Sequence, residues 1–187
     1  ALKTISPADI PVVILCGGRG SRLKEETEII PKPMVPIGDK PILWHIMKIY
    51  SSQGFNEFII CLGEKAHVVK NYFYNYSSLY RDFTLDLSSG DIEYHSDPTE
   101  NNWRVTLVDT GQATLKGGRI KRIEKYLDAD INMLTYGDGL SDVDLARLLA
   151  FHKSHGKIIT ITAVNQPSRF GVLEEKDGKV LSFREKP

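Results

Sequence analysis

The sequence predicts an α/β protein with a mostly parallel sheet. Residues 12–15 and 58–62 form two short apolar runs, and runs of this kind are typical of buried strands. Between them, residues 42–50 carry apolar side chains at helical spacing. A strand, a helix and a second strand in this order form a right-handed parallel crossover, so both strands should lie parallel in one sheet.

Size and charge narrow the possible functions. The chain has 187 residues, of which 41% are hydrophobic, enough for one domain with a substantial core. Its 24 Lys and Arg residues balance its 24 Asp and Glu residues, so no overall positive field favours nucleic acid as a partner. Any phosphate binding must therefore be local.

The start of the chain and the two cysteines predict its compartment. Residues 1–11 are interpreted as a leader without a signal peptide, and residues 12–187 as the domain. No apolar run reaches the length of about 20 residues that spans a bilayer. Cys16 and Cys61 lie in strand-like runs and are expected to be reduced core thiols. We therefore expect a cytoplasmic protein that does not bind a membrane.

The remaining elements follow from the same periodicities. Further strands and helices alternate along the chain, and a closing hairpin turns at Asp177 and Gly178. We expect helices at residues 42–50, 66–76 and 119–127 and one that starts at 145 and stops at Gly156, and strands at 83–87, 104–109, 133–136, 157–164, 171–175 and 180–183.

The glycine-rich segment after the first strand is the main functional signal. Residues 17–23 read G-G-R-G-S-R-L, and Lys32 follows ten residues after Arg22. Glycines allow a backbone to approach a ligand closely, and bare N–H groups in such a turn bind phosphate oxygens. We interpret the segment as a phosphate-binding loop, although a plain glycine turn with two solvated cations is the alternative.

Two better-known phosphate loops do not fit this segment. The dinucleotide fingerprint would need a glycine where Leu23 stands, and the P-loop pattern is absent. Both loops also require a helix directly after the glycines, whereas prolines at 31, 33, 36 and 41 keep the following stretch extended. An NAD-dependent oxidoreductase is therefore disfavoured.

A carboxylate follows another predicted strand. Asp138 lies between Gly137 and Gly139, directly after the strand at residues 133–136. Ligands of parallel sheets collect outside the carboxyl ends of the strands, so Asp138 and the glycine loop should border one crevice. A plain turn aspartate is the alternative interpretation.

The motifs resemble those of the sugar-phosphate nucleotidyltransferases. The glycine segment is followed at residues 31–43 by P-K-P-M-V-P-I-G-D-K-P-I-L, and the segment at 105–119 resembles the cytidylyltransferase branch of that family. The resemblance implies a Rossmann-like three-layer nucleotidyltransferase domain with a mostly parallel sheet. Within the family an E-K-P motif lies in the middle of the domain, so the chain, which ends in E-K-P, is expected to lack its C-terminal part.

The resemblance also implies an activity and its reactants. It implies transfer of a cytidylyl group from CTP to glucose 1-phosphate, assisted by Mg²⁺, in a homo-oligomer. Asp138 would bind the metal, and Arg22 and Lys32 would act with it as the catalytic residues. Lys186 would bind the sugar phosphate. The implied nucleotide-binding residues are Leu15, Gly17, Gly18, Arg19, Gly20, Ser21, Arg22, Lys32, Thr110, Arg119 and Gly137.

Some assignments leave alternatives open. Arg119 could be a solvated residue at a helix N-terminus, although a cation there opposes the helix dipole. Two alternatives concern the function. The same fold could use UTP or dTTP instead of CTP, or the chain could be a nucleotide-binding module without turnover.

Overall fold

The computed structural model describes residues 6–18, 30–97, 100, 102–164 and 172–184. The chain divides into two compact units, Ala1–Ala146 and Arg147–Pro187, a division that the sequence alone did not predict. The boundaries expected from the sequence, 1–11 and 12–187, stay a prediction. Each unit is described by itself below.

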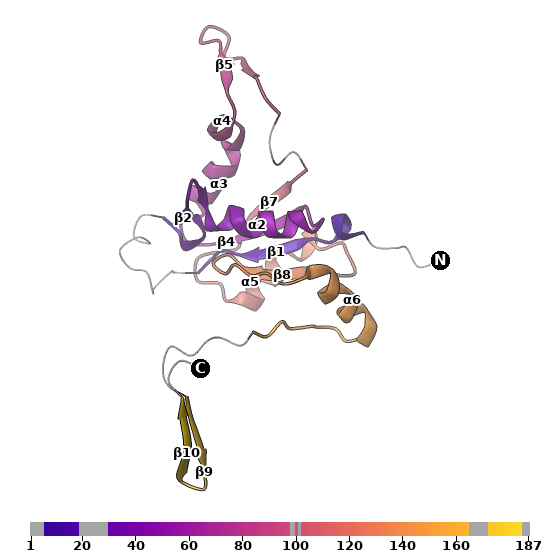
Figure 1. Ribbon diagram of the computed structural model, residues 1–187. Coiled ribbons are helices and arrows are strands. Elements are labelled where there is room, and N and C mark those ends of the chain that lie inside the picture. Colours follow the sequence, from indigo (N-terminus) through magenta and orange to yellow (C-terminus); the bar gives the residue numbers. More distant parts are fainter. Residues whose placement is uncertain (1–5, 19–29, 98–99, 101, 165–171, 185–187) are drawn as a thin grey trace. The chain divides into compact units, whose positions relative to one another are not determined.

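A four-stranded parallel sheet forms the centre of the first unit. Its strands lie in the order β7 (Arg104–Asp109), β4 (Glu57–Leu62), β1 (Val12–Leu15) and β8 (Met133–Tyr136). All three neighbouring pairs are parallel, with Leu15 opposite Cys61 on one side and opposite Tyr136 on the other. The predicted α/β class and the parallel sheet are therefore confirmed (Figure 1).

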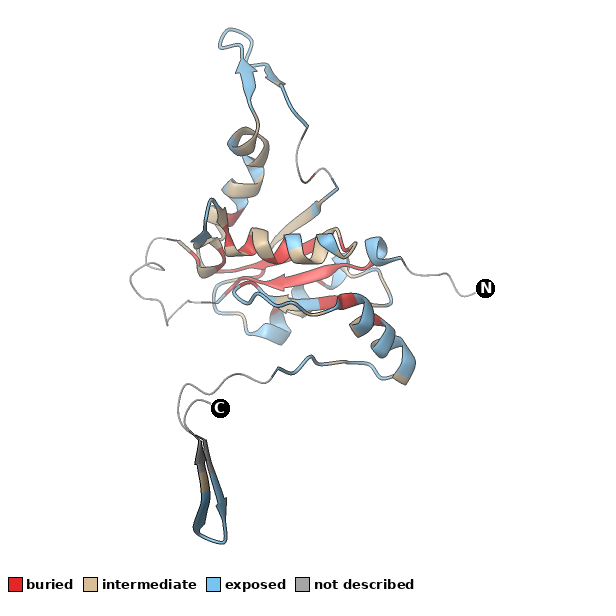
Figure 2. Cartoon of the chain, viewed as in Figure 1, coloured by how far each residue is buried: buried red, intermediate tan, exposed pale blue. Residues whose placement is uncertain are grey.

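The two central strands are apolar because both of their faces are covered. Successive side chains of a strand point to opposite faces. On one face Val13, Leu15, Ile59 and Cys61 pack with Ile123, which follows helix α5 (Lys116–Arg122). On the other face lies helix α2 (Ile42–Ser52), whose buried residues turn toward β1 (Figure 2).

Short irregular elements flank this core. The 3₁₀ helix η1 (Pro7–Asp9) is capped by the Ser6 hydroxyl, and Ile10 after it is completely buried. Thus the second half of the expected leader packs against the domain. The 3₁₀ helix η2 (Lys32–Met34) leads through strands β2 (Pro36–Ile37) and β3 (Lys40–Pro41) into α2, and η3 (Glu124–Tyr126) follows α5.

The segment between β4 and β7 extends away from the sheet (Figure 1). It consists of α3 (Ala66–Tyr74), α4 (Tyr76–Tyr80) and a hairpin of β5 (Phe83–Leu85) and β6 (Ile92–Tyr94). The aromatic residues of α3 do not belong to the core, since only Val69 of this helix is buried. The aromatic rings instead pack on one another, as Tyr72 does on Phe73 and Tyr76.

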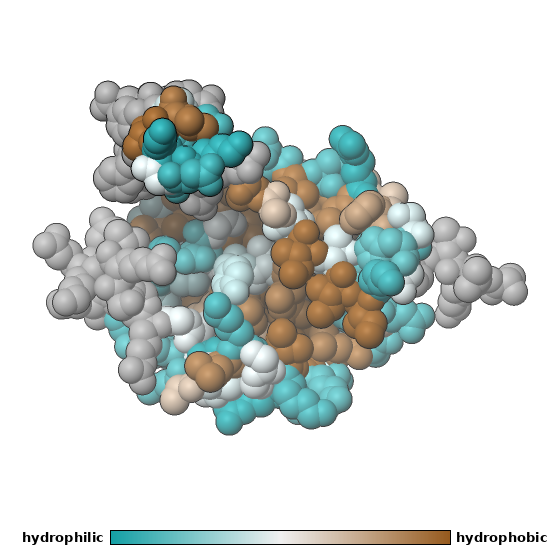
Figure 3. All heavy atoms as spheres, turned by 90° about the horizontal axis from the view of Figure 1, so that it is seen from below, coloured by the Kyte–Doolittle hydropathy of each residue, from teal (hydrophilic) through white to brown (hydrophobic). Residues whose placement is uncertain are grey.

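The edge strand β8 differs from the central strands. Leu134 and Tyr136 are each about half exposed, at 51% and 48%. Since β1 pairs with only one side of β8, the other side forms an open edge among the described residues. Figure 3, which views the molecule from below, shows apolar and hydrophilic side chains side by side on one face.

The second unit contains most of α6 and a hairpin. Helix α6 (Leu145–His155) starts in the first unit and ends before Gly156, as predicted. Strands β9 (Val172–Lys176) and β10 (Lys179–Arg184) pair across Asp177 and Gly178, both with positive φ, which confirms the expected turn. The strand predicted at residues 157–164 is wrong: this stretch has irregular backbone. A strand needs a neighbour for its N–H and C=O groups, and none of the described strands pairs with this stretch.

No helix of the described residues is long and apolar enough to cross a membrane.

Candidate active site

The carboxyl ends of the four parallel strands carry the candidate site. Hydrogen bonds between the strands continue past their last residues: Gly137 N–H donates to Leu15 O (3.1 Å), and Cys16 N–H donates to Cys61 O (2.9 Å). These bonds bring the residues after β1 and β8 to the same edge of the sheet. The crevice predicted at this edge is therefore confirmed in its position.

A cavity of about 730 Å³ lies at this edge. It is bordered by the start of the glycine loop, by η2, by the loop before α5 and by the residues after β8. Its lining residues are Leu15, Cys16, Gly17, Gly18, Lys32, Pro33, Gln112, Ala113, Thr114, Leu115, Lys116, Arg119, Tyr136, Gly137 and Asp138. Seven of the residues predicted from the sequence thus border one space.

Lys32 and Asp138 form an ion pair in this cavity. The Lys32 Nζ atom donates a hydrogen bond to Asp138 Oδ2 at 2.6 Å, across 106 residues of sequence. Pro31 and Pro33 position Lys32 at the start of η2, since proline stabilises the first turn of such a helix. Both side chains are partly exposed, at 29% and 41%, so they remain accessible to a ligand.

Thr110 is buried behind the cavity wall, and Arg119 is a largely buried part of that wall. Thr110 is completely buried, and its hydroxyl donates to Leu62 O at 2.6 Å. Arg119 is 5% exposed and donates hydrogen bonds to four oxygen atoms of the protein. Direct contact of Thr110 with a nucleotide stays a prediction, and the hydroxyl is engaged within the protein here.

The position of Arg119 in its helix differs from the prediction. The sequence predicted a helix at residues 119–127 with Arg119 at its N-terminus. Helix α5 in fact starts at Lys116, so Arg119 lies in its last turn. A cation in the last turn of a helix is favourable, so the helix dipole gives no reason to assign Arg119 a function.

Cys16 forms part of the floor of the cavity. Its thiol is buried, as is that of Cys61, and neither forms a disulfide, so the prediction of core thiols is confirmed. Burial is the main cause that raises the pKa of the Cys16 thiol far above its ordinary value, and it raises the pKa of Cys61 to about 11. Both thiols therefore stay protonated and unreactive at neutral pH.

We expect both thiols to resist alkylation while the protein is folded. Iodoacetamide at pH 8.5 should leave Cys16 and Cys61 unmodified for hours, and it should label both within minutes in concentrated urea. Mass spectrometry of the two samples measures this.

The same thiols make the stability of the protein depend on pH. Because the folded state holds the thiol protons more tightly, the contribution of the thiols to stability is full below about pH 8.5 and is lost as the pH rises toward 11. Rapid labelling of the native protein would contradict the assigned burial.

Five predicted site residues lie outside the described residues, namely Arg19, Gly20, Ser21, Arg22 and Lys186.

The sequence did not single out several residues of the cavity wall. Gln112, Leu115 and Lys116 line it from the loop before α5 and from its first residue, and Lys116 Nζ lies 5.2 Å from the centre of the Tyr136 ring. No local pattern marks them, because their position depends on where α5 starts. The rule that ligands collect at the carboxyl ends of parallel strands could have identified Tyr136, because Tyr136 is the last residue of β8.

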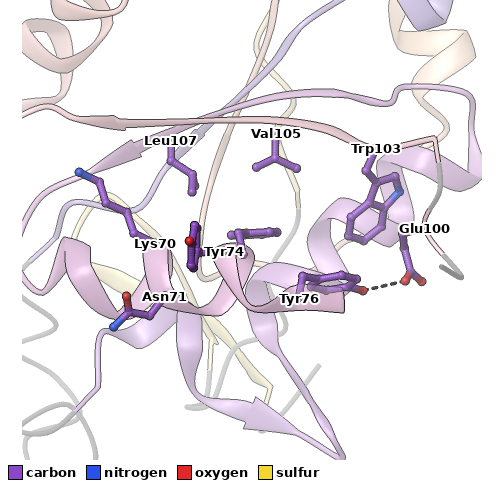
Figure 4. Close-up of a pocket in the computed structure, with 9 residues that line it drawn as sticks. Lys70, Asn71, Tyr74, Tyr76, Glu100, Trp103, Val105 and Leu107 are labelled. Atoms are coloured by element: carbon purple, nitrogen blue, oxygen red, sulfur yellow. Dashed lines mark hydrogen bonds between the residues drawn. The ribbon is translucent and has the colours of Figure 1, made fainter. Parts of the chain in front are cut away.

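A second hollow, of about 590 Å³, lies between β7 and α3 (Figure 4). None of the predicted site residues lines it, and its walls are mainly aromatic and aliphatic. The carboxylate of Glu100 is buried there and accepts a hydrogen bond from the Tyr76 hydroxyl at 2.7 Å (Figure 4). An apolar hollow with an engaged carboxylate does not suit a triphosphate, so the first cavity is the candidate active site.

Among its described lining residues, the cavity offers one carboxylate, that of Asp138, to a divalent cation. Among the described residues, no three His, Cys, Asp or Glu side chains lie together as a metal site. Mg²⁺ commonly uses only one or two protein carboxylates and takes its other ligands from water and substrate phosphates. The accessible carboxylate of Asp138 therefore fits a magnesium ion that arrives with a phosphate ligand.

Comparison with known proteins defines the class to which this architecture belongs. A family model described as nucleotidyl transferase matches residues 11–187, and the chain belongs to this family. This result confirms the family that the glycine and proline motifs predicted.

Two curated relatives are closely similar in sequence. The glucose-1-phosphate cytidylyltransferase of Salmonella typhimurium is 51% identical over 94% of this chain and 68% of its own length. The probable glucose-1-phosphate cytidylyltransferase of Bacillus subtilis is 44% identical over 93% of this chain and 68% of its own length. The resemblance to the cytidylyltransferase branch is thus confirmed.

Among solved structures, HddC from Yersinia pseudotuberculosis has a TM-score of 0.62 at 27% identity and is matched over 95% of this chain and 69% of its own. A putative glucose-1-phosphate thymidylyltransferase from Bacillus anthracis, with a TM-score of 0.57 at 20% identity, shares the fold.

Proposed function

We propose that this chain transfers a cytidylyl group from CTP to α-D-glucose 1-phosphate and releases pyrophosphate and CDP-glucose. The observation that carries this proposal is the pair of Lys32 and Asp138, 2.6 Å apart, in a cavity that the glycine loop borders. The similarity to relatives named glucose-1-phosphate cytidylyltransferase supports the base and the sugar.

The reaction needs no general base. A phosphate monoester loses its second proton near pH 6, so the attacking oxygen of glucose 1-phosphate is already ionised at neutral pH. This oxygen forms a bond to the α-phosphorus of CTP. The bond from that phosphorus to the bridging oxygen breaks, and pyrophosphate leaves with the electron pair. The protein must therefore bring two polyanions together and stabilise the charge that moves to the leaving group.

Lys32 and Asp138 suit these two tasks. The ammonium of Lys32 would lie beside the α-phosphate, where it offsets the repulsion between the substrates. The carboxylate of Asp138 would hold Mg²⁺, which, when bound, withdraws charge from the phosphate oxygens. The two side chains neutralise each other, so neither is left as an isolated charge in the cavity.

The other roles that the family resemblance implies complete the proposal. Arg22 would bind the β- and γ-phosphates through its planar guanidinium, and Lys186 would bind the sugar phosphate. A homo-oligomer in the cytoplasm is the expected form of the enzyme.

A coupled assay of pyrophosphate release tests this function. The full chain should release pyrophosphate only when CTP, glucose 1-phosphate and Mg²⁺ are all present. Equal rates with UTP or dTTP would reject the choice of cytidine. Calorimetric binding of CTP without turnover would instead identify a nucleotide-binding module.

A further inference from the structure

We propose that Arg119 is a positioning residue, whose buried guanidinium ties together the carboxyl ends of three strands and holds the start of the glycine loop. The proposal rests on the proposed function only for the identity of the ligand. It concerns how the cavity keeps its shape before any ligand arrives.

The hydrogen bonds of Arg119 reach three different strands. Its Nη1 atom donates to Leu62 O at 2.9 Å, at the end of β4, and to Thr110 Oγ1 at 2.6 Å, just after β7. Its Nη2 atom donates to Gly17 O at 2.8 Å, two residues after β1, and to Gln112 O at 3.2 Å. Each Nη atom carries two hydrogens, so all four are engaged within the protein. Of the five N–H donors of the guanidinium, only Nε–H takes no part in these four bonds, so the side chain is committed mainly to the protein.

Two glycines make room for this guanidinium. A Cβ atom on Gly17 would lie 2.1 Å from both Cζ and Nη1 of Arg119. A Cβ atom on Gly63 would lie 2.8 Å from Nη1 and 2.9 Å from the Cα atom of Gly17. Neither glycine has a positive φ, so their backbone conformation would also allow other residues. Glycine is needed at both positions because a larger side chain would collide with the guanidinium. Gly17 is therefore explained by the arginine beside it, independently of any phosphate.

The next glycine provides a contrast. Among the described residues, a Cβ atom on Gly18 would meet no heavy atom within 4 Å, and this residue also lines the cavity. The two consecutive glycines thus differ in their described surroundings, since Gly17 touches the guanidinium and Gly18 does not. This difference allows a matched comparison of two Gly→Ala variants.

The charge of Arg119 is buried without a carboxylate partner among the described residues. Its hydrogen-bond acceptors are three carbonyl oxygens and a hydroxyl, all neutral, and it forms none of the ion pairs observed. Burial of a charge is costly unless it is fully hydrogen-bonded, and these four oxygens meet that need. The remaining positive potential favours an anion in the adjacent cavity without requiring a direct contact.

Thermal unfolding of a double-mutant cycle tests the contact. We expect Gly17→Ala to lower the Tm of the full chain by roughly 3–8 °C, because the new methyl group displaces the guanidinium. The matched Gly18→Ala variant should stay within about 2 °C of the wild type. In an Arg119→Met background the same Gly17→Ala change should cost less than half as much, because the guanidinium is gone. Arg119→Lys serves as a second background if the methionine variant does not fold.

Kinetics distinguishes positioning from direct contact with the nucleotide. A misplaced glycine loop should lower kcat, so Arg119→Lys should reduce kcat at least about tenfold while KM for CTP changes less than about threefold. A residue that contacts CTP equally in the ground and transition states would instead raise KM at unchanged kcat.

Two results would overturn the proposal: equal Tm losses from Gly17→Ala in the wild-type and Arg119→Met backgrounds, or a rise in KM alone. If even the wild type shows no turnover with CTP, the proposed function fails, while the Tm cycle still decides whether Arg119 and Gly17 are coupled.

Discussion

Asp138→Asn is expected to reduce kcat for CDP-glucose formation by at least about a hundredfold. The substitution keeps the shape of the side chain and one oxygen, but it removes the negative charge that would hold Mg²⁺. It also leaves Lys32 without the carboxylate that lies 2.6 Å from its ammonium. Pyrophosphate release at saturating CTP, glucose 1-phosphate and Mg²⁺ measures the loss.

Asp142→Asn is the matched control for this prediction. Asp142 is exposed, lies four residues downstream and does not line the cavity, so the same chemical change should leave kcat within about twofold. Folding should be unaffected in both variants, because a partly exposed ion pair contributes only about 0–1 kcal/mol. A rate above one third of wild type in Asp138→Asn would refute the metal role of this carboxylate.

The central sheet could be predicted because its signals are local. Strands β1 and β4 are short apolar runs, and α2 between them has regular helical spacing, so neighbouring residues suffice to identify them. The order of the strands then places Asp138 and the glycine loop at one edge. Strand order therefore explains why Asp138 shares a cavity with Gly17 and Gly18, and Lys32 reaches this cavity from η2.

The start of α5 could not be predicted in this way. Gly117 and Gly118 lie inside this helix, although glycine is unfavourable in helices, and the sequence therefore indicated a loop. The close approach that Gly118 allows offsets part of this propensity. A Cβ atom on Gly118 would lie 2.9 Å from the Thr114 side chain, so the helix packs closely against the loop before it.

The role of Arg119 was also beyond prediction from sequence patterns. Two of its acceptors, Leu62 O and Gly17 O, lie 57 and 102 residues away along the chain. Both are backbone carbonyls, which every residue possesses, so no side-chain pattern marks them. Only the assembled sheet shows that one guanidinium reaches both.

Gly137→Ala is the second substitution for which we expect a large effect, and here the cause is a steric clash of the added methyl group. A Cβ atom on Gly137 would lie 2.5 Å from the Cys16 Sγ atom, 3.0 Å from Pro33 Cγ and 3.3 Å from Leu15 O. The backbone of Gly137 is not in the left-handed region, so alanine is acceptable there except for these contacts. Overpacking of this kind costs about 1–3 kcal/mol, and the strain should move Asp138 away from Lys32. We expect a Tm loss of several degrees, measured by calorimetry, and a fall in kcat of at least about tenfold.

Gly139→Ala separates this steric effect from a general sensitivity of the loop. A Cβ atom on Gly139 would meet no heavy atom of the described part of the chain within 4 Å, so this variant should be as stable as the wild type or slightly more stable. Adding Cys16→Ala to Gly137→Ala removes the closest clashing atom and should restore part of the lost Tm relative to the Gly137→Ala variant. Because Cys16 and Pro33 both contact this position, the restoration should be incomplete. If Gly137→Ala and Gly139→Ala had the same Tm and the same kcat, close packing of Gly137 against Cys16 would not be what holds Asp138 in place.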